Sequence, residues 1–198
     1  MKLYITPGSA YARMARMVVL EKGLSGRVEV LLAKTRTPES PYYAVNPSGR
    51  VPYLVCDDGM GLEESALICA YLDELDGRPS LELRGWEARR LEALARSLLD
   101  GLSVWLRETL RPVAERSPGV IAHERERARR LTDVWETLMR SPLLEGPLNM
   151  VQITLACALG LEARIADFHP RDARPRLAAW LAAFSARPSF AATAPSAR

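Results

Sequence analysis

Cysteine and histidine are scarce in this chain of 198 residues. Its three cysteines and two histidines are too few and too widely spaced for a disulfide framework or a zinc site; they are Cys56, Cys69, Cys157, His123 and His169. A reducing cytoplasm is therefore the compartment that we expect, and we expect no metal cofactor.

Long hydrophobic runs and a large charge surplus are also missing. The longest apolar stretch, residues 153–161, is far shorter than the ~20 residues that a membrane span needs. Pro7 and Gly8 interrupt the N-terminus before the core of a signal peptide could form. The net charge of +3 is too small to indicate nucleic-acid binding. We therefore expect neither a membrane nor a nucleic-acid partner.

The first part of the chain alternates between strand-like and helix-like patterns. We expect strands over residues 2–6, 27–32, 51–56 and 60–62, and helices over 10–22 and 64–75. Segment 35–49 is rich in Pro, Ser, Asn and Gly and predicts a loop with at most one helical turn. The order β-α-β, then β-β-α, predicts a four-stranded mixed sheet with one parallel pair and one antiparallel hairpin.

The composition changes after residue 77, and strand patterns disappear. Leucines at steps of three and four predict a long amphipathic helix over residues 86–111, ended by Pro112. Further helices are expected over residues 120–140, 149–166 and 174–185, followed by a tail over 190–198. Because segment 149–166 is apolar on nearly all sides, we expect it at the centre of a bundle. The predicted domains are 1–77 and an all-helical 85–198, with a linker over 78–84.

Two helix starts in the first part carry polar side chains suited to a ligand. Ser9 directly precedes the helix over 10–22, where free amides and the helix dipole favour an anion. At the next helix, the amide and hydroxyl of Ser65 can bind a carboxylate, and Glu64 can bind an ammonium group. Both starts also have ordinary explanations, namely an N-cap serine and acidic residues that complement the helix dipole.

A third segment lies before the strand that begins near Tyr53. Pro52 cannot donate a hydrogen bond to a sheet. A cis Val51–Pro52 bond would turn the backbone of Val51 outward and leave its N–H and C=O able to pair with an extended peptide. The ordinary alternative is a loop followed by an edge strand.

Together these segments resemble the cytosolic glutathione S-transferase family, in particular small bacterial members of about this length. The resemblance runs from end to end and rests on Ser9 and Arg13, on the run 46–52, on Glu64-Ser65 and on the tail 187–190. It implies a thioredoxin-like α/β N-terminal domain, an all-α C-terminal domain, a homodimer and glutathione as co-substrate.

The resemblance also implies which residues bind glutathione. The cysteinyl backbone of glutathione would pair with Val51, with Pro52 in the cis form. Its γ-glutamyl end would contact Glu64 and Ser65, and Arg50 would approach the glycyl carboxylate.

Ser9 matches the activating serine of the family. Lowering a thiol pKa from ~8.5 by ~2 units needs ~2.7 kcal/mol of differential stabilisation. One hydroxyl hydrogen bond to a charged acceptor supplies ~1.5–3 kcal/mol, and a helix N-terminus adds roughly 0.3–1 kcal/mol. The thiolate would then attack a small hydrophobic electrophile, in a pocket that the resemblance assigns to Tyr11, Ser103 and Trp105.

Two alternative functions can be weighed on the sequence, and the second is disfavoured. One is a glutathione-binding or protein-interaction member of this fold with little turnover. The other is a thiol–disulfide exchanger, which needs a cysteine at the first helix start, where this chain has Ala10. The run Ser9-Ala10-Tyr11 also departs from the Ser-Pro-aromatic run of many relatives.

Overall fold

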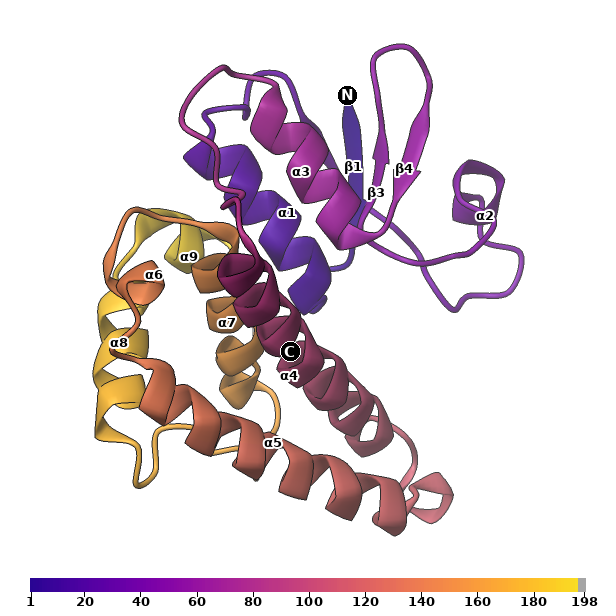
Figure 1. Ribbon diagram of the computed structural model, residues 1–198. Coiled ribbons are helices and arrows are strands. Elements are labelled where there is room, and N and C mark those ends of the chain that lie inside the picture. The colour runs from indigo at the N-terminus through magenta and orange to yellow at the C-terminus, as the bar shows by residue number, and fades with distance from the viewer. Residues whose placement is uncertain (196–198) are drawn as a thin grey trace. The chain divides into compact units, whose positions relative to one another are not determined.

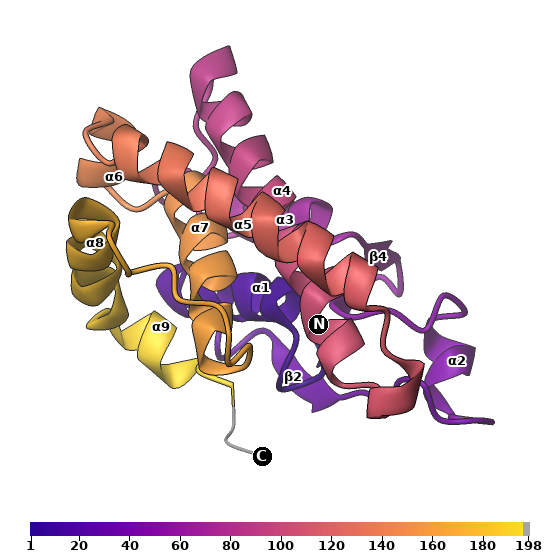
Figure 2. The ribbon, with the colours of Figure 1, turned by 90° about the horizontal axis from the view of Figure 1, so that it is seen from below.

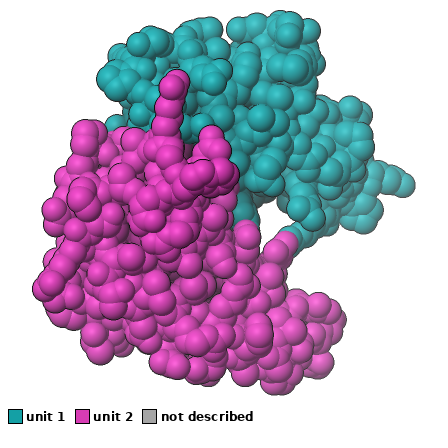
Figure 3. All heavy atoms as spheres, in the orientation of Figure 1, with its two compact units in different colours: residues 1–82, 188–198 teal, residues 83–187 magenta. Residues whose placement is uncertain are grey.

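The computed structural model describes residues 1–195 and divides into two compact units (Figure 3). The first unit comprises Met1–Glu82 with Pro188–Arg198, and the second comprises Leu83–Arg187. This grouping differs from the expected domains, because residues 78–82 and the C-terminal segment join the first unit. The end of the expected tail, residues 196–198, lies outside the described residues.

The first unit contains a four-stranded sheet in the order β2-β1-β3-β4 (Figure 1). The strands are β1 (Lys2–Ile5), β2 (Glu29–Leu32), β3 (Tyr53–Val55) and β4 (Gly61–Glu63). β1 is parallel to β2 and antiparallel to β3, and β4 is antiparallel to β3. The sequence-based prediction of a mixed sheet with one parallel pair and one hairpin is therefore confirmed.

Helices cover the sheet of this unit. α1 (Ala10–Glu21) and α3 (Ser65–Glu74) lie side by side on one face, and the single turn α2 (Tyr42–Val45) lies on the other side (Figure 1). The core between the sheet and the helix pair consists of fully buried side chains, among them Leu3, Met14, Met17, Leu54, Ile68 and Leu72. Their removal from water stabilises the unit.

The C-terminal segment joins the first unit through Arg13, a buried residue of α1. Its guanidinium lies 3.5 Å from the ring centroid of Phe190, a residue of α9 (Pro188–Ala192). Arg13 Nη2 also donates a hydrogen bond of 2.7 Å to the backbone oxygen of Phe190, and its Nε donates to Thr193 Oγ1. These contacts explain why a segment remote in sequence packs with α1.

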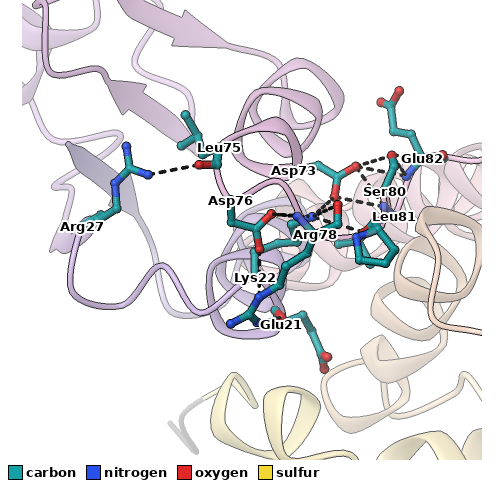
Figure 4. A network of polar contacts seen from close by, with 11 residues as sticks. Glu21, Lys22, Arg27, Asp73, Leu75, Asp76, Arg78, Ser80, Leu81 and Glu82 are labelled. Atoms are coloured by element: carbon teal, nitrogen blue, oxygen red, sulfur yellow. Dashed lines mark hydrogen bonds and ion pairs between the residues drawn. The ribbon is translucent and has the colours of Figure 1, made fainter.

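A buried charge cluster joins the ends of α1 and α3 (Figure 4). Lys22 Nζ lies 2.9 Å from Asp73 Oδ1 and 2.8 Å from Asp76 Oδ1. Asp73 also accepts hydrogen bonds from the Ser80 hydroxyl at 2.6 Å and from the Leu81 amide. The cluster therefore attaches residues 78–82 to the two helices.

The second unit is helical. It contains α4 (Trp86–Thr109), α5 (Pro118–Leu138), α6 (Pro142–Glu145), α7 (Met150–Leu159) and α8 (Pro175–Ser185), with 3₁₀ turns at Val113–Glu115 and Gly160–Ala163. Every residue of α7 is buried, and α7 contacts α4, α6 and α8 (Figure 2). The expected central helix is thus present, but it ends at Leu159 because the chain tightens into a 3₁₀ turn. No helix within residues 1–195 is long and apolar enough to cross a membrane.

We expect Asp73→Asn to destabilise the protein. Burial opposes ionisation of Asp73, but hydrogen bonds from Ser80, the Leu81 amide and Lys22 outweigh burial and lower its pKa. The ionised Asp73 therefore adds to the free energy of unfolding above the unfolded-state pKa of about 3.9. This contribution is lost as the pH falls below that value. The variant should lose about 3 kcal/mol of unfolding free energy at neutral pH, because Lys22 loses a buried partner.

Urea unfolding across a pH series measures this effect, with Glu74→Gln, an exposed carboxylate of the same helix, as the control. The stability of the wild type should fall more steeply in acid than that of Asp73→Asn. Equal unfolding free energies for both proteins at pH 7 would contradict the assignment.

Candidate functional site

Strand register brings three chain segments to one edge of the sheet. Tyr4 lies opposite Tyr53, and Tyr53 lies opposite Glu63. Because β3 runs antiparallel to both β1 and β4, the end of β1, the start of β3 and the end of β4 share an edge. Each of these three strand ends adjoins one candidate segment. Ser9 follows β1, Val51-Pro52 directly precedes β3, and Glu64-Ser65 directly follows β4.

Ser9 is the N-cap of α1. Its backbone is extended (φ −82°, ψ 116°), and its Oγ accepts a hydrogen bond of 3.1 Å from the amide of Ala12. A serine hydroxyl has two lone pairs and one proton. Capping uses a lone pair and leaves the proton for another acceptor, so the structural and activating roles of Ser9 are compatible.

The Val51–Pro52 peptide bond is cis, as the family resemblance implied. Pro52 is buried, Val51 is half-buried and Arg50 is exposed. Within residues 1–195, no hydrogen bond engages the backbone N–H or C=O of Val51. This strand-like pair of main-chain groups can therefore accept an extended peptide.

Glu64 and Ser65 form the third part of the edge. Glu64 is exposed and has φ +78°, ψ 117°, a backbone conformation that costs a non-glycine residue about 1–3 kcal/mol. The side chain of Glu64, the N-cap residue of α3, makes no capping hydrogen bond, and the amides of a first helical turn are suited to an anion. Ser65 is 2% exposed, and its hydroxyl lies 3.3 Å from Glu64 Oε1.

The residues expected around a second substrate lie in both units. Tyr11 is half-buried in α1, and Ser103 is half-buried in α4. Trp105, also in α4, is only 1% exposed and packs edge-on against Phe168 with 6.1 Å between ring centroids. This burial favours a core role for Trp105 over the pocket role that we expected.

Neither metal chemistry nor thiol exchange has an evident site in the part of the chain described. No group of three or more His, Cys, Asp or Glu side chains in residues 1–195 is placed to hold a metal ion. The cysteines Cys56, Cys69 and Cys157 are all buried, and none lies at the start of α1.

Sequence reasoning missed two residues that support this edge. Tyr42 and Asn46 both donate hydrogen bonds to the backbone oxygen of Arg50, directly before Val51. Asn46 belongs to the run 46–52 that carries the family resemblance, whereas Tyr42 lies outside it. The sequence carried no signal that singles out Tyr42, because Tyr43 beside it is also aromatic.

Comparison with known proteins decides the family. The family model of the glutathione S-transferase N-terminal domain matches residues 8–75. A protein of Escherichia coli K12, the uncharacterized GST-like protein YibF, is 31% identical over 202 residues, covering 98% of each chain. The chain belongs to the glutathione S-transferase family.

Solved structures of glutathione S-transferase family members share the fold. A family member from Pseudomonas fluorescens Pf-5 with bound glutathione is 31% identical, with a TM-score of 0.87 and 99% of each chain covered. A glutathione S-transferase from Methylobacillus flagellatus KT with glutathione bound is 30% identical, with a TM-score of 0.85 over 98% of this chain and 99% of that one. The predicted fold, a thioredoxin-like domain followed by helices, is confirmed.

The positive φ of Glu64 predicts that a glycine at this position is more stable than an alanine in this glutathione S-transferase family member. At an ordinary position alanine is more stable than glycine, but glycine adopts φ +78° without steric cost. Glu64→Gly should therefore be more stable than Glu64→Ala by about 1 kcal/mol. Chemical denaturation measures the difference, and an alanine variant at least as stable as the glycine variant would show that the backbone there is relaxed.

Proposed function

We propose that this protein is an enzyme that activates the thiol of glutathione for attack on a small hydrophobic electrophile. The observation that carries the proposal is the convergence of Ser9, the unpaired backbone of Val51 and the Glu64–Ser65 helix start on one sheet edge. The two relatives described above that hold glutathione support it.

In this proposal each part of the tripeptide has a complementary group. The backbone N–H and C=O of Val51 pair with the cysteinyl residue, next to Pro52. Ser65 and the first-turn amides of α3 bind the γ-glutamyl carboxylate, and the carboxylate of Glu64 binds its ammonium group. The exposed guanidinium of Arg50 reaches the glycyl carboxylate.

Ser9 supplies the activation. The thiol of bound glutathione releases its proton to solvent, and the Ser9 hydroxyl donates a hydrogen bond to the sulfur anion. The thiolate then forms a carbon–sulfur bond with the electrophile, while the bond to the leaving group breaks and its electron pair departs with that group. Ser9 keeps its own proton, so no protein base is needed.

The proposal also covers the electrophile pocket, the oligomeric state and the cellular compartment. Tyr11 and Ser103 are the candidates to contact the electrophile, and Trp105 supports α4 from the core. We further propose a cytoplasmic homodimer that detoxifies electrophiles, with glutathione as the co-substrate and no metal. A binding protein with little turnover is the second candidate, and the pKa of the bound thiol separates the two.

Ser9→Ala should leave glutathione affinity nearly unchanged and lower turnover. The hydrogen bond to the sulfur stabilises the thiolate and the transition state, so its loss should reduce kcat with an aryl halide by roughly one to two powers of ten. The pKa of bound glutathione, measured by thiolate absorbance, should rise toward its solution value.

Ser117→Ala is the matched control, because Ser117 caps α5 by accepting from the Val120 amide and has no part in the proposed site. Both variants lose an N-cap worth about 0.5–2 kcal/mol, but only Ser9→Ala should move the thiol pKa. A fully active Ser9→Ala enzyme would refute the role of Ser9. A wild-type protein that binds glutathione without shifting its thiol pKa would favour the binding-protein candidate.

A further inference from the structure

Two buried side chains converge on the backbone oxygen of Arg50. Tyr42 Oη donates a hydrogen bond of 2.5 Å to this oxygen, and Asn46 Nδ2 donates a second one of 3.0 Å. Tyr42 is 5% exposed and Asn46 is 2% exposed. A backbone carbonyl in an otherwise irregular loop is thus held by two donors from the preceding segment.

These contacts fix the direction of the next amide. The C=O of Arg50 and the N–H of Val51 belong to one planar peptide unit, which is trans, so the two groups point in opposite directions. Because the oxygen faces Tyr42 and Asn46, the Val51 N–H is directed away from them. No hydrogen bond within residues 1–195 uses this N–H.

We propose that Tyr42 and Asn46 are positioning residues for glutathione, because they set the orientation of the Val51 amide before the tripeptide arrives. This inference rests on the proposed function, in which Val51 pairs with the cysteinyl backbone. Without the two donors, the peptide unit would have to be ordered on binding, at a cost in conformational entropy.

A second set of contacts extends from Asn46 to the helix start of the same site. Asn46 Oδ1 accepts a hydrogen bond of 3.1 Å from the Ser48 amide. The Ser48 hydroxyl in turn lies 2.7 Å from Glu63 Oε1. Since Glu63 directly precedes Glu64, Asn46 connects the Val51 loop with the segment that would hold the γ-glutamyl end.

Tyr42 is suited to remain a donor. Burial raises the pKa of its hydroxyl, which therefore keeps its proton across the neutral range. Its ring also lies 5.5 Å from that of Tyr4 in β1, between ring centroids. Tyr42→Phe removes the hydrogen bond to Arg50, together with the longer one of 3.4 Å that Asn46 Nδ2 donates to Tyr42 Oη, and leaves the ring available for this contact.

Calorimetry with glutathione tests the proposal on Tyr42→Phe. The Kd should rise roughly threefold to tenfold, as expected for the loss of the short hydrogen bond to the Arg50 oxygen. The KM for glutathione should rise in step, whereas kcat at saturating glutathione and the pKa of the bound thiol should stay at wild-type values, because Ser9 is untouched. A merely structural role would lower the melting temperature without this split.

Tyr43→Phe is the matched control, since the Tyr43 hydroxyl makes no hydrogen bond within residues 1–195. The Kd of this variant for glutathione should equal that of the wild type. Asn46→Asp provides the second variant, because it keeps an acceptor for the Ser48 amide but removes the donor to Arg50. Its Kd should rise at least as much as that of Tyr42→Phe.

Backbone NMR relaxation of the Val51 N–H gives a readout without ligand. Its order parameter should be about 0.85 in the wild type and should fall toward 0.6 in Tyr42→Phe. An unchanged Kd and an unchanged order parameter in the folded variants would overturn this inference alone. A wild-type protein that binds no glutathione would overturn it together with the proposed function.

Discussion

The alignment of Tyr4, Tyr53 and Glu63 across three strands is the constraint on which the candidate site depends. It sets where the chain leaves β1 toward Ser9, where it enters β3 after Pro52 and where it turns from β4 into α3. Gly61 leaves room for the Tyr53 side chain in this arrangement, because a Cβ at that position would lie 1.9 Å from the Tyr53 hydroxyl. A shift of one residue in this register would move each of the three segments and reverse the facing of the strand side chains.

The rest of the first unit holds the helices that extend from this edge. Arg13 joins α1 to the C-terminal segment, and the cluster around Lys22 joins the far ends of α1 and α3. Arg13 and the Lys22–Asp73 pair are buried, and Arg13 and Asp73 each take part in several hydrogen bonds, so these contacts favour one arrangement of the helices. α1 is thus held near its start by Arg13, and α1 and α3 are held together at their far ends by the Lys22 cluster, which suits a site that must bind a ligand in a defined geometry.

Much of this arrangement could be predicted from the sequence because it follows from local rules. The spacing of apolar residues predicted the strands of the sheet and the helices that pack on it. Ser9, Pro52 and Ser65 lie at or next to the starts of elements that this spacing predicted. The paired hydrogen bonds from Tyr42 and Asn46 could not be predicted, since the pattern of a polar loop does not reveal which donor meets which carbonyl. The attachment of the C-terminal segment to α1 was missed for a similar reason, because Arg13 and Phe190 are 177 residues apart. The role expected for Trp105 did not anticipate its burial against Phe168.

Titration of the ¹⁵N-labelled protein with glutathione, followed through its backbone amide spectrum, tests the central claim most directly. If the sheet edge binds the tripeptide, the amides of Ser9, Val51 and Ser65 should shift together along one saturable curve. The amides at the opposite end of the sheet, such as that of Asp58 in the β3–β4 turn, should stay in place. Shifts that cluster away from this edge, or no shifts at millimolar glutathione, would contradict the account.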